Sequence, residues 1–132
     1  TAIRRGIKNV PKDDAIENMR LLCENVLEPV RDNYGIPFTL NSGFRSYELN
    51  EAVGSSSSAQ HVTGHAADFE IPTVANKTLA RWIKDNLEYD QVLLEFYKAD
   101  DPSSGWVHCS YVESENRQQA KQFDGRSWTP LT

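Results

Sequence analysis

The longest regular pattern in the sequence is an apolar stripe within residues 13–34. Its members recur at spacings of three and four residues, as on one face of an α-helix; they are Ile16, Met19, Leu22, Cys23, Val26, Leu27 and Val30. Pro29 lacks a backbone N–H and its ring clashes with the preceding turn, so we expect a kink and a displaced or separate last turn. Gly35 is expected to end the helix.

Alternation of apolar and polar residues predicts strands, whose side chains point to opposite faces in turn. The expected strands cover residues 37–40, 66–71, 91–97 and 106–112. Pro72 would end the second of them. The last two flank KADDPSSG, a turn-rich connection that suits a β-hairpin with a long loop.

Two further helices and two loops are predicted between these strands. Gly43 permits a turn within residues 42–46, and a short helix over residues 47–53 leads into a flexible serine run at residues 55–58. Thr73 or Asn76 is expected to cap a helix that runs through Leu87. Its inner face would carry Leu79, Trp82, Ile83 and Leu87. Residues beyond Glu113 are interpreted as helix or loop.

This order of elements predicts an α+β fold, with helices packed on one face of a small, mostly antiparallel sheet. A chain of 132 residues is expected to form a single domain over residues 1–132.

Composition excludes several classes of protein. A formal charge of −5 without a dense Lys/Arg face argues against a nucleic-acid binder. No apolar run approaches the ~18 residues of a membrane span, and the N-terminal TAIRRGIKNV lacks the apolar stretch of a secretory signal. We therefore expect a soluble monomer. Cys23 and Cys109 are too few for a disulfide framework, and both are expected to be buried.

The segment AQHVTGHAADFE, residues 59–70, combines two histidines with two carboxylates. His61 and His65 are four residues apart, as in metal-binding pairs on a helix. Gly64 lies between them, however, and no glutamate follows the first, so the zincin pattern fails. We expect His65 to be exposed.

A different set of ligands draws on the predicted strands. His61, near the end of the serine-rich loop, and Asp68, on the strand, can converge on one ion. Strand alternation places Trp106, His108 and Ser110 on one face, and His108 can join the other two ligands if its strand neighbours the Asp68 strand. Two imidazoles and one carboxylate leave the fourth position of a tetrahedral zinc open to water. Since zinc lowers the pKa of such a water from about 15.7 to about 7, the site would be hydrolytic.

Taken together, these motifs resemble the D-Ala-D-Ala carboxypeptidase family of zinc metallopeptidases. The family includes vancomycin-resistance dipeptidases and phage L-alanyl-D-glutamate endolysins, and the hedgehog signalling domain shares its fold. Its signature is SxHxxGxAxD with a later WxH or ExxH strand, matched here by AQHVTGHAAD at residues 59–68 and WVH at residues 106–108. The match continues through residues 27–54 and 90–96. The resemblance implies one Zn²⁺ per chain, held by His61, Asp68 and His108.

The resemblance also implies that Arg45 binds the carboxylate or a backbone carbonyl of the substrate, because a guanidinium fork matches paired oxygens. A surface salt bridge is the alternative for this arginine. Two departures from the family pattern stand out. Ala59 replaces the serine of the first motif, a role we assign to Ser58 or Ser57, and Gly105 stands where the ExxH members have a glutamate.

Glu95 is the candidate general base in place of that glutamate. The predicted hairpin can place it across from His108, where a carboxylate takes a proton from water and passes it to the leaving amine. The alternative is an outward-facing strand glutamate. Glu70, Asp100 and Asp101 are other acidic candidates, interpreted as surface groups or groups behind the ligands. Trp106 is expected to wall the substrate pocket or to fill the core.

The resulting hypothesis is a zinc-dependent peptidase that cuts peptidoglycan stem peptides, as a D-Ala-D-Ala carboxypeptidase or an L-Ala-D-Glu endopeptidase. Such an enzyme acts at the bacterial cell wall or periplasm, here in a phage or prophage lytic or tail-associated role. A catalytically inactive zinc-binding module of the same fold is the main alternative, and a peptidase with a different peptide substrate is a third.

Overall fold

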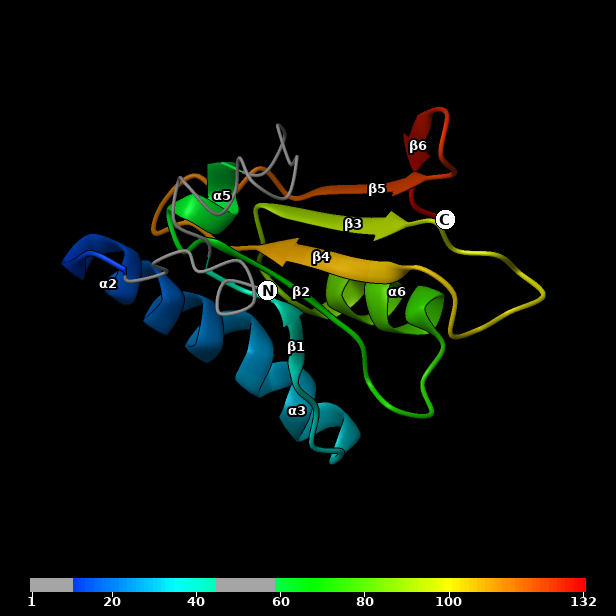
Figure 1. Cartoon of the computed structure of the whole chain (residues 1–132), viewed down its shortest axis with the longest axis horizontal. Helices are drawn as coiled ribbons and strands as arrows, with labels where there is room; N and C mark the ends of the chain where they lie inside the picture. Colours follow the sequence, from blue (N-terminus) through cyan, green and yellow to red (C-terminus); the bar gives the residue numbers. More distant parts are fainter. Residues whose placement is uncertain (1–10, 45–58) are drawn as a thin grey trace, which may run out of the picture.

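The computed structural model describes residues 11–44 and 59–132, which form an α+β fold (Figure 1). Its helical segments are α2 (Asp13–Leu22), the π-helix η1 (Cys23–Leu27), α3 (Glu28–Tyr34), α5 (Ala59–Val62) and α6 (Asn76–Asn86). Its strands are β1 (Leu40–Ser42), β2 (Ala66–Phe69), β3 (Gln91–Glu95), β4 (Trp106–Ser110), β5 (Gln119–Phe123) and β6 (Trp128–Pro130). None of the helices in the described ranges is long and apolar enough to cross a membrane.

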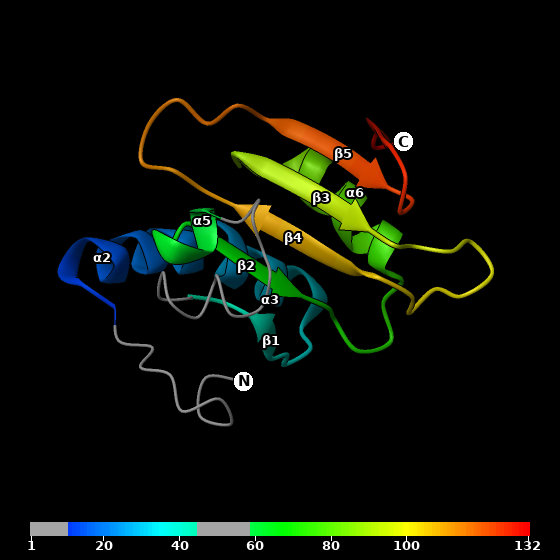
Figure 2. The ribbon, with the colours of Figure 1, turned by 45° about the horizontal axis from the view of Figure 1, so that its top comes forward.

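The six strands form one sheet in the order β1-β2-β4-β3-β5-β6 (Figure 2). All neighbouring pairs are antiparallel except β3 and β5, which run parallel. The predicted fold class is therefore confirmed, as is the hairpin between β3 and β4. In this register His108 of β4 lies between Asp68 on one neighbour and Leu93 on the other.

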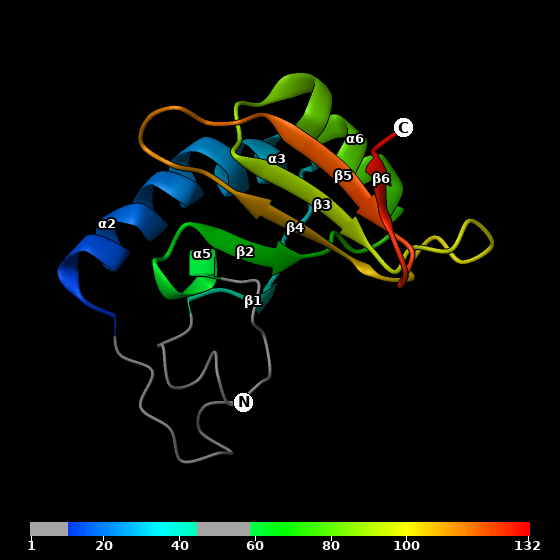
Figure 3. The ribbon, with the colours of Figure 1, turned by 90° about the horizontal axis from the view of Figure 1, so that it is seen from above.

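The two faces of the sheet have different roles. One face is buried against α3 and α6, which lie together on one side of the sheet in Figure 3. The core on that side includes Val30, Ala67, Phe69, Leu79, Ile83, Val92, Leu94, Val107 and Cys109. Strand alternation turns Asp68, Glu95, Trp106 and His108 to the opposite face. The short helix α5 belongs to that second face, so the helices do not all pack on one side as expected.

The helical run over residues 13–34 is interrupted one turn before Pro29. The N–H of Glu28 bonds to the carbonyl of Cys23, five residues back, and η1 ends there. A wider turn of this kind absorbs the ring of Pro29 and its missing donor, so the disruption takes the form of a π-segment and α3 begins around the proline. The wide turn also changes which side chains face the core: Leu22 is buried, whereas Cys23 is exposed. The expectation that both cysteines are buried is wrong for Cys23 and confirmed for Cys109.

Several predicted boundaries move. The first strand covers β1 and not residues 37–40, because pairing with β2 requires Leu40 opposite Phe69 and Ser42 opposite Asp68. Helix α6 begins at Asn76 with Ala75 as its N-cap and no side-chain cap, so neither predicted cap forms. Gly35 ends the helical run with a φ of 65°, as predicted. The expected helix at residues 47–53 and the serine run at 55–58 lie outside the described residues.

The segment beyond Glu113 forms β5 and β6 and is neither helix nor loop throughout. β5 reads QAKQF, which lacks clear apolar alternation. It is ordered by main-chain pairing, since its five residues run parallel to the five of β3. A pattern based on side-chain hydrophobicity does not detect a strand of this kind.

Candidate metal centre

Three side chains from three elements converge on the open face of the sheet: His61 from α5, Asp68 from β2 and His108 from β4. Their ligand-type atoms all lie within 4.8 Å of one another. Oδ1 of Asp68 is 2.9 Å from Nδ1 of His108 and 3.4 Å from Nε2 of His61. The two imidazole rings meet edge to face, with centroids 5.2 Å apart. The expected convergence of these residues is thus present in the fold.

Main-chain geometry produces this convergence. The β2–β4 register sets Asp68 directly opposite His108. After α5 the chain reverses at Gly64, whose φ is 80°, and this brings His61 back over β2. A side chain at Gly64 would lie 2.4 Å from the carbonyl oxygen of Ala15, so only glycine fits this close approach. The motif glycine therefore positions the first histidine.

The hydrogen bonds of His61 fit a metal ligand. Its Nδ1 lies 2.8 Å from the carbonyl oxygen of Gly43, so Nδ1 carries the proton and donates it. Nε2 is then left with a lone pair, and within the described residues this buried atom has no hydrogen-bond partner. A buried, unpaired nitrogen beside a carboxylate and a second imidazole is the arrangement that zinc completes.

The Asp68 carboxylate is anionic at neutral pH. Burial raises the pKa of this carboxyl, but its interactions with the neighbouring His108 and His61 outweigh that effect and hold the pKa well below its usual range. Metal binding requires deprotonated ligands. Asp68 is thus prepared to coordinate a cation without first losing a proton.

A buried carboxylate anchors the helical turn that carries His61. Asp90 is only 3% exposed. Its Oδ2 accepts hydrogen bonds from Gln60 of α5 at 2.7 Å and from Arg117 at 2.6 Å, and its Oδ1 accepts from Nε of Arg117 at 3.0 Å. The paired contacts with Arg117 come from a segment 27 residues away. Sequence reasoning missed this network because no local spacing links its members.

The Asp90 network predicts an acid-sensitive fold. Hydrogen bonding to Arg117, opposed by burial, lowers the pKa of Asp90 to about 2. A carboxyl whose pKa is lower when folded contributes stability above pH ~4, and this contribution is lost as the pH falls towards 2. In Asp90→Asn, we expect the free energy of unfolding at pH 7 to fall by about 2 kcal/mol. In urea denaturation across this pH range, the free energy of unfolding of Asp90→Asn should change less with pH than that of the parent. Asp32→Asn, at an exposed position, should follow the parent.

Glu95 lies on the same face as the three candidate ligands. It pairs across the hairpin with Trp106, whose indole Nε1 donates a 2.8 Å hydrogen bond to Oε2 of Glu95. Burial raises the pKa of this carboxyl, although the Trp106 hydrogen bond and the charge of His108 oppose the shift. Its charge also interacts with Asp68 and His61. Glu95 is therefore half-buried beside the centre and does not face away from it.

Trp106 supports that carboxylate. Its ring packs against Phe96, with centroids 5.2 Å apart, and its N–H points to Glu95. Trp106 is half-buried on the open face, so it does not fill the core, and its role as a wall of the substrate pocket stays a prediction. One oxygen of Glu95 is thereby held, and Oε1 has no partner among the described contacts.

Gly105 explains why the ExxH glutamate is absent. It adopts a φ of 69°, and a Cβ at this position would lie 2.0 Å from the carbonyl oxygen of Glu95. A glutamate at position 105 would therefore displace the strand that carries Glu95.

This close approach predicts a large loss of stability in Gly105→Ala. Gly35 is the matched control, because its φ is also positive, at 65°, but nothing lies within 4 Å of an added Cβ. We expect Gly35→Ala to lose about 1 kcal/mol and Gly105→Ala about 3 kcal/mol or more, measured by urea denaturation. Equal losses of stability would mean that the left-handed backbone conformation, and not the contact with Glu95, is the reason why position 105 requires glycine.

A model of the Peptidase M15 family matches residues 1–110. The chain belongs to the peptidase M15 family. This confirms the predicted relationship to the zinc D-Ala-D-Ala carboxypeptidases. Because the family is zinc-dependent, and His61, Asp68 and His108 could hold a metal ion, membership indicates a zinc metallopeptidase. A search of curated proteins found no match.

The other acidic candidates of this M15 chain are not part of the cluster of three ligands. Glu70 accepts hydrogen bonds from Asn41 and Asn76, both at 2.9 Å. Asp100 and Asp101 are exposed in the β3–β4 loop, as expected of surface groups.

The remaining motif residues differ in how far the structure describes them. His65 is half-buried with its Nδ1 2.6 Å from the Thr63 hydroxyl, and burial lowers its pKa, so the expected exposure is wrong. The short turn α5 folds this histidine against the sheet. Arg45, Ser57 and Ser58 lie outside the described residues, and their roles stay predictions.

Proposed function

We propose that this chain hydrolyses peptide bonds in peptidoglycan stem peptides, with one zinc ion held by His61, Asp68 and His108. The observation that carries the proposal is the cluster of these three side chains beside Glu95 on the open face of the sheet. Family membership supports peptidase activity on peptidoglycan and action outside the cytoplasm.

The ligand set leaves room for chemistry. Three protein ligands are typical of catalytic zinc, whereas structural zinc has four. When bound, zinc polarises a carbonyl oxygen and makes water acidic enough to attack near neutral pH.

Glu95 acts as the general base in this proposal. The indole of Trp106 holds Oε2, so Oε1 accepts the proton of the attacking water and then delivers it to the leaving amine. Burial raises the pKa of this carboxyl, which makes it a stronger base towards water. Trp106 keeps the carboxylate in place between the two steps.

Substrate recognition is assigned to residues of the motif. Arg45 binds a carboxylate or carbonyl of the stem peptide, Trp106 borders the site, and Ser58 supplies the hydroxyl that the family serine would give. We further propose a monomer of the D-Ala-D-Ala carboxypeptidase or L-Ala-D-Glu endopeptidase type, in a phage or prophage lytic role. The resemblance of the motifs to phage endolysins supports this role.

Removal of the metal tests the proposal. The zinc-loaded chain should cleave purified peptidoglycan, lose this activity on dialysis against a chelator, and regain it when zinc is added. Mass spectrometry of the products separates loss of a terminal D-Ala from cleavage after L-Ala. Cleavage that persists in excess chelator would contradict a metal-dependent mechanism.

Gly105 favours a second candidate, a zinc-binding module without peptidase activity. In this case the family glutamate has been lost and Glu95 only supports the fold. Binding of zinc with no cleavage of any stem peptide would support the module.

A further inference from the structure

We propose that a pocket beside the metal centre binds a primary ammonium group on an aliphatic chain, such as the side chain of a diamino acid residue in the stem peptide, with Glu70 as the anionic partner. This inference rests on the proposed function and specifies its substrate. None of the three candidate zinc ligands lines the pocket.

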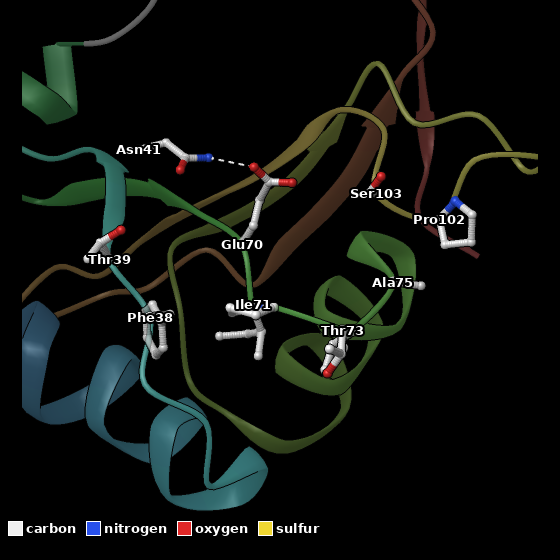
Figure 4. Close-up of a pocket in the computed structure, with 11 residues that line it drawn as sticks. Phe38, Thr39, Asn41, Glu70, Ile71, Thr73, Ala75, Pro102 and Ser103 are labelled. Atoms are coloured by element: carbon white, nitrogen blue, oxygen red, sulfur yellow. Dashed lines mark hydrogen bonds between the residues drawn. The ribbon is translucent and has the colours of Figure 1, made fainter.

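The pocket measures about 490 Å³ and lies between β1, the end of β2, the segment that leads into α6, and the β3–β4 loop (Figure 4). Ligand pockets commonly fall between 300 and 1,000 Å³, so it is large enough for an amino-acid side chain. Its walls combine polar residues with apolar ones, which include Phe38, Ile71 and Val74. The apolar residues suit a methylene chain, and Glu70 is the only ionisable residue among the described residues that line the pocket.

Within residues 11–44 and 59–132, the Glu70 carboxylate has no cationic partner. Its Oε2 accepts from Nδ2 of Asn41 and its Oε1 from Nδ2 of Asn76, each at 2.9 Å; Figure 4 shows the first of these bonds. Both donors are neutral amides, and no ion pair to Glu70 occurs among the described side chains. Each oxygen of this half-buried carboxylate accepts from one neutral donor and has capacity for a further hydrogen bond. An ammonium ion could donate these further hydrogen bonds to both oxygens of Glu70.

The carboxylate is held rigidly. Asn76 is 1% exposed, and its Nδ2 also lies 3.0 Å from the carbonyl oxygen of Ser104 and 3.2 Å from that of Gly105. Thr73, in the pocket wall, has a φ of 68°, a strained conformation for a β-branched residue. Fixed donors and local strain of this kind are typical of binding sites.

The position of the pocket relates it to the cleavage site. Glu70 follows the ligand Asp68 by two residues, roughly 7 Å along an extended chain. Asn41 adjoins Ser42, which pairs with Asp68 across β1 and β2. A substrate residue next to the scissile bond can therefore reach Glu70 with its side chain.

Binding of two matched peptides tests the inference. The probes are a stem pentapeptide with a blocked N-terminus and lysine at its third position, and the same peptide with Nε-acetyl-lysine. Zinc-loaded Glu95→Gln is used to suppress turnover, and Kd is measured by calorimetry. We expect the free amine to bind about tenfold tighter than the acetylated peptide. Adding Glu70→Gln should abolish this difference and change the Kd of the acetylated peptide less than about twofold.

Asp100→Asn is the matched control, since it removes one exposed negative charge from the nearby loop but does not line the pocket. It should keep the preference for the amine. Equal binding of the two peptides by the Glu95→Gln protein would overturn the inference without any Glu70 variant. A preference that survives Glu70→Gln would also overturn it. Peptidoglycan cleavage by the parent chain is measured separately, so failure of the proposed function would be seen independently.

Discussion

Replacing Glu95 with glutamine is expected to lower kcat by about 10²–10⁴-fold while zinc stays bound. Glutamine has the same shape, and its carbonyl oxygen can still accept the hydrogen bond from the Trp106 indole. What is lost is the ability to take a proton from water and return it to the leaving amine. The measurement is kcat on a stem peptide together with the zinc content of the purified variant.

Glu88→Gln is a suitable control, because Glu88 is an exposed glutamate just before β3 and its replacement removes the same charge. It should retain the kcat of the parent. If Glu95→Gln also retained full activity, Glu95 would not be the base. If its zinc content fell with its activity, the loss could not be assigned to proton transfer.

Asp68→Asn is expected to weaken zinc binding by more than about 100-fold and to remove activity. Oδ1 of Asp68 lies close to both imidazoles, at 2.9 Å from Nδ1 of His108 and 3.4 Å from Nε2 of His61. The two imidazoles are neutral when they bind a metal, so this carboxylate is the sole negative charge in the ligand set. An amide in its place cannot compensate the cation.

Competition with a chromophoric chelator measures the loss of affinity. Glu70→Gln removes a carboxylate two residues further along the same segment and should keep the zinc affinity of the parent. An Asp68→Asn protein that binds zinc as tightly as the parent would mean that the ion is held by other residues.

The convergence of the candidate ligands could be predicted from the sequence because it depends on strand alternation. Residues 106–112 predict that His108 shares a face with Trp106, and a β-hairpin predicts that Glu95 lies beside that face. The glycine at position 64 and the small residues before Asp68 allow a tight reversal. The β2–β4 register bears out the placement of Asp68 beside His108. The β3–β4 register places Glu95 opposite Trp106 and not opposite His108 as expected, although strand alternation keeps Glu95 on the same face.

Contacts between distant segments could not be predicted. Gln60 and Arg117 both donate hydrogen bonds to Asp90. Their positions in the sequence show no regular spacing from which these contacts could be predicted. β5 is ordered by pairing with β3, because its polar side chains give no periodic signal. The π-segment before Pro29 likewise depends on how the helix packs on the core. The sequence indicated a disruption at this proline but not its form.

The candidate metal ligands Asp68 and His108 alternate with core residues along β2 and β4, and this alternation limits how members of the family can vary in length. In β4, His108 faces the candidate zinc site while its neighbours Val107 and Cys109 are fully buried. Inserting or deleting a single residue within β2 or β4 would exchange the residues that face the candidate zinc site with those that face the core. In β4, this change would turn the imidazole of His108 into the apolar core and the thiol of Cys109 towards the candidate zinc site. Natural relatives are therefore expected to differ by indels in the connecting loops and to keep these two strands constant in length.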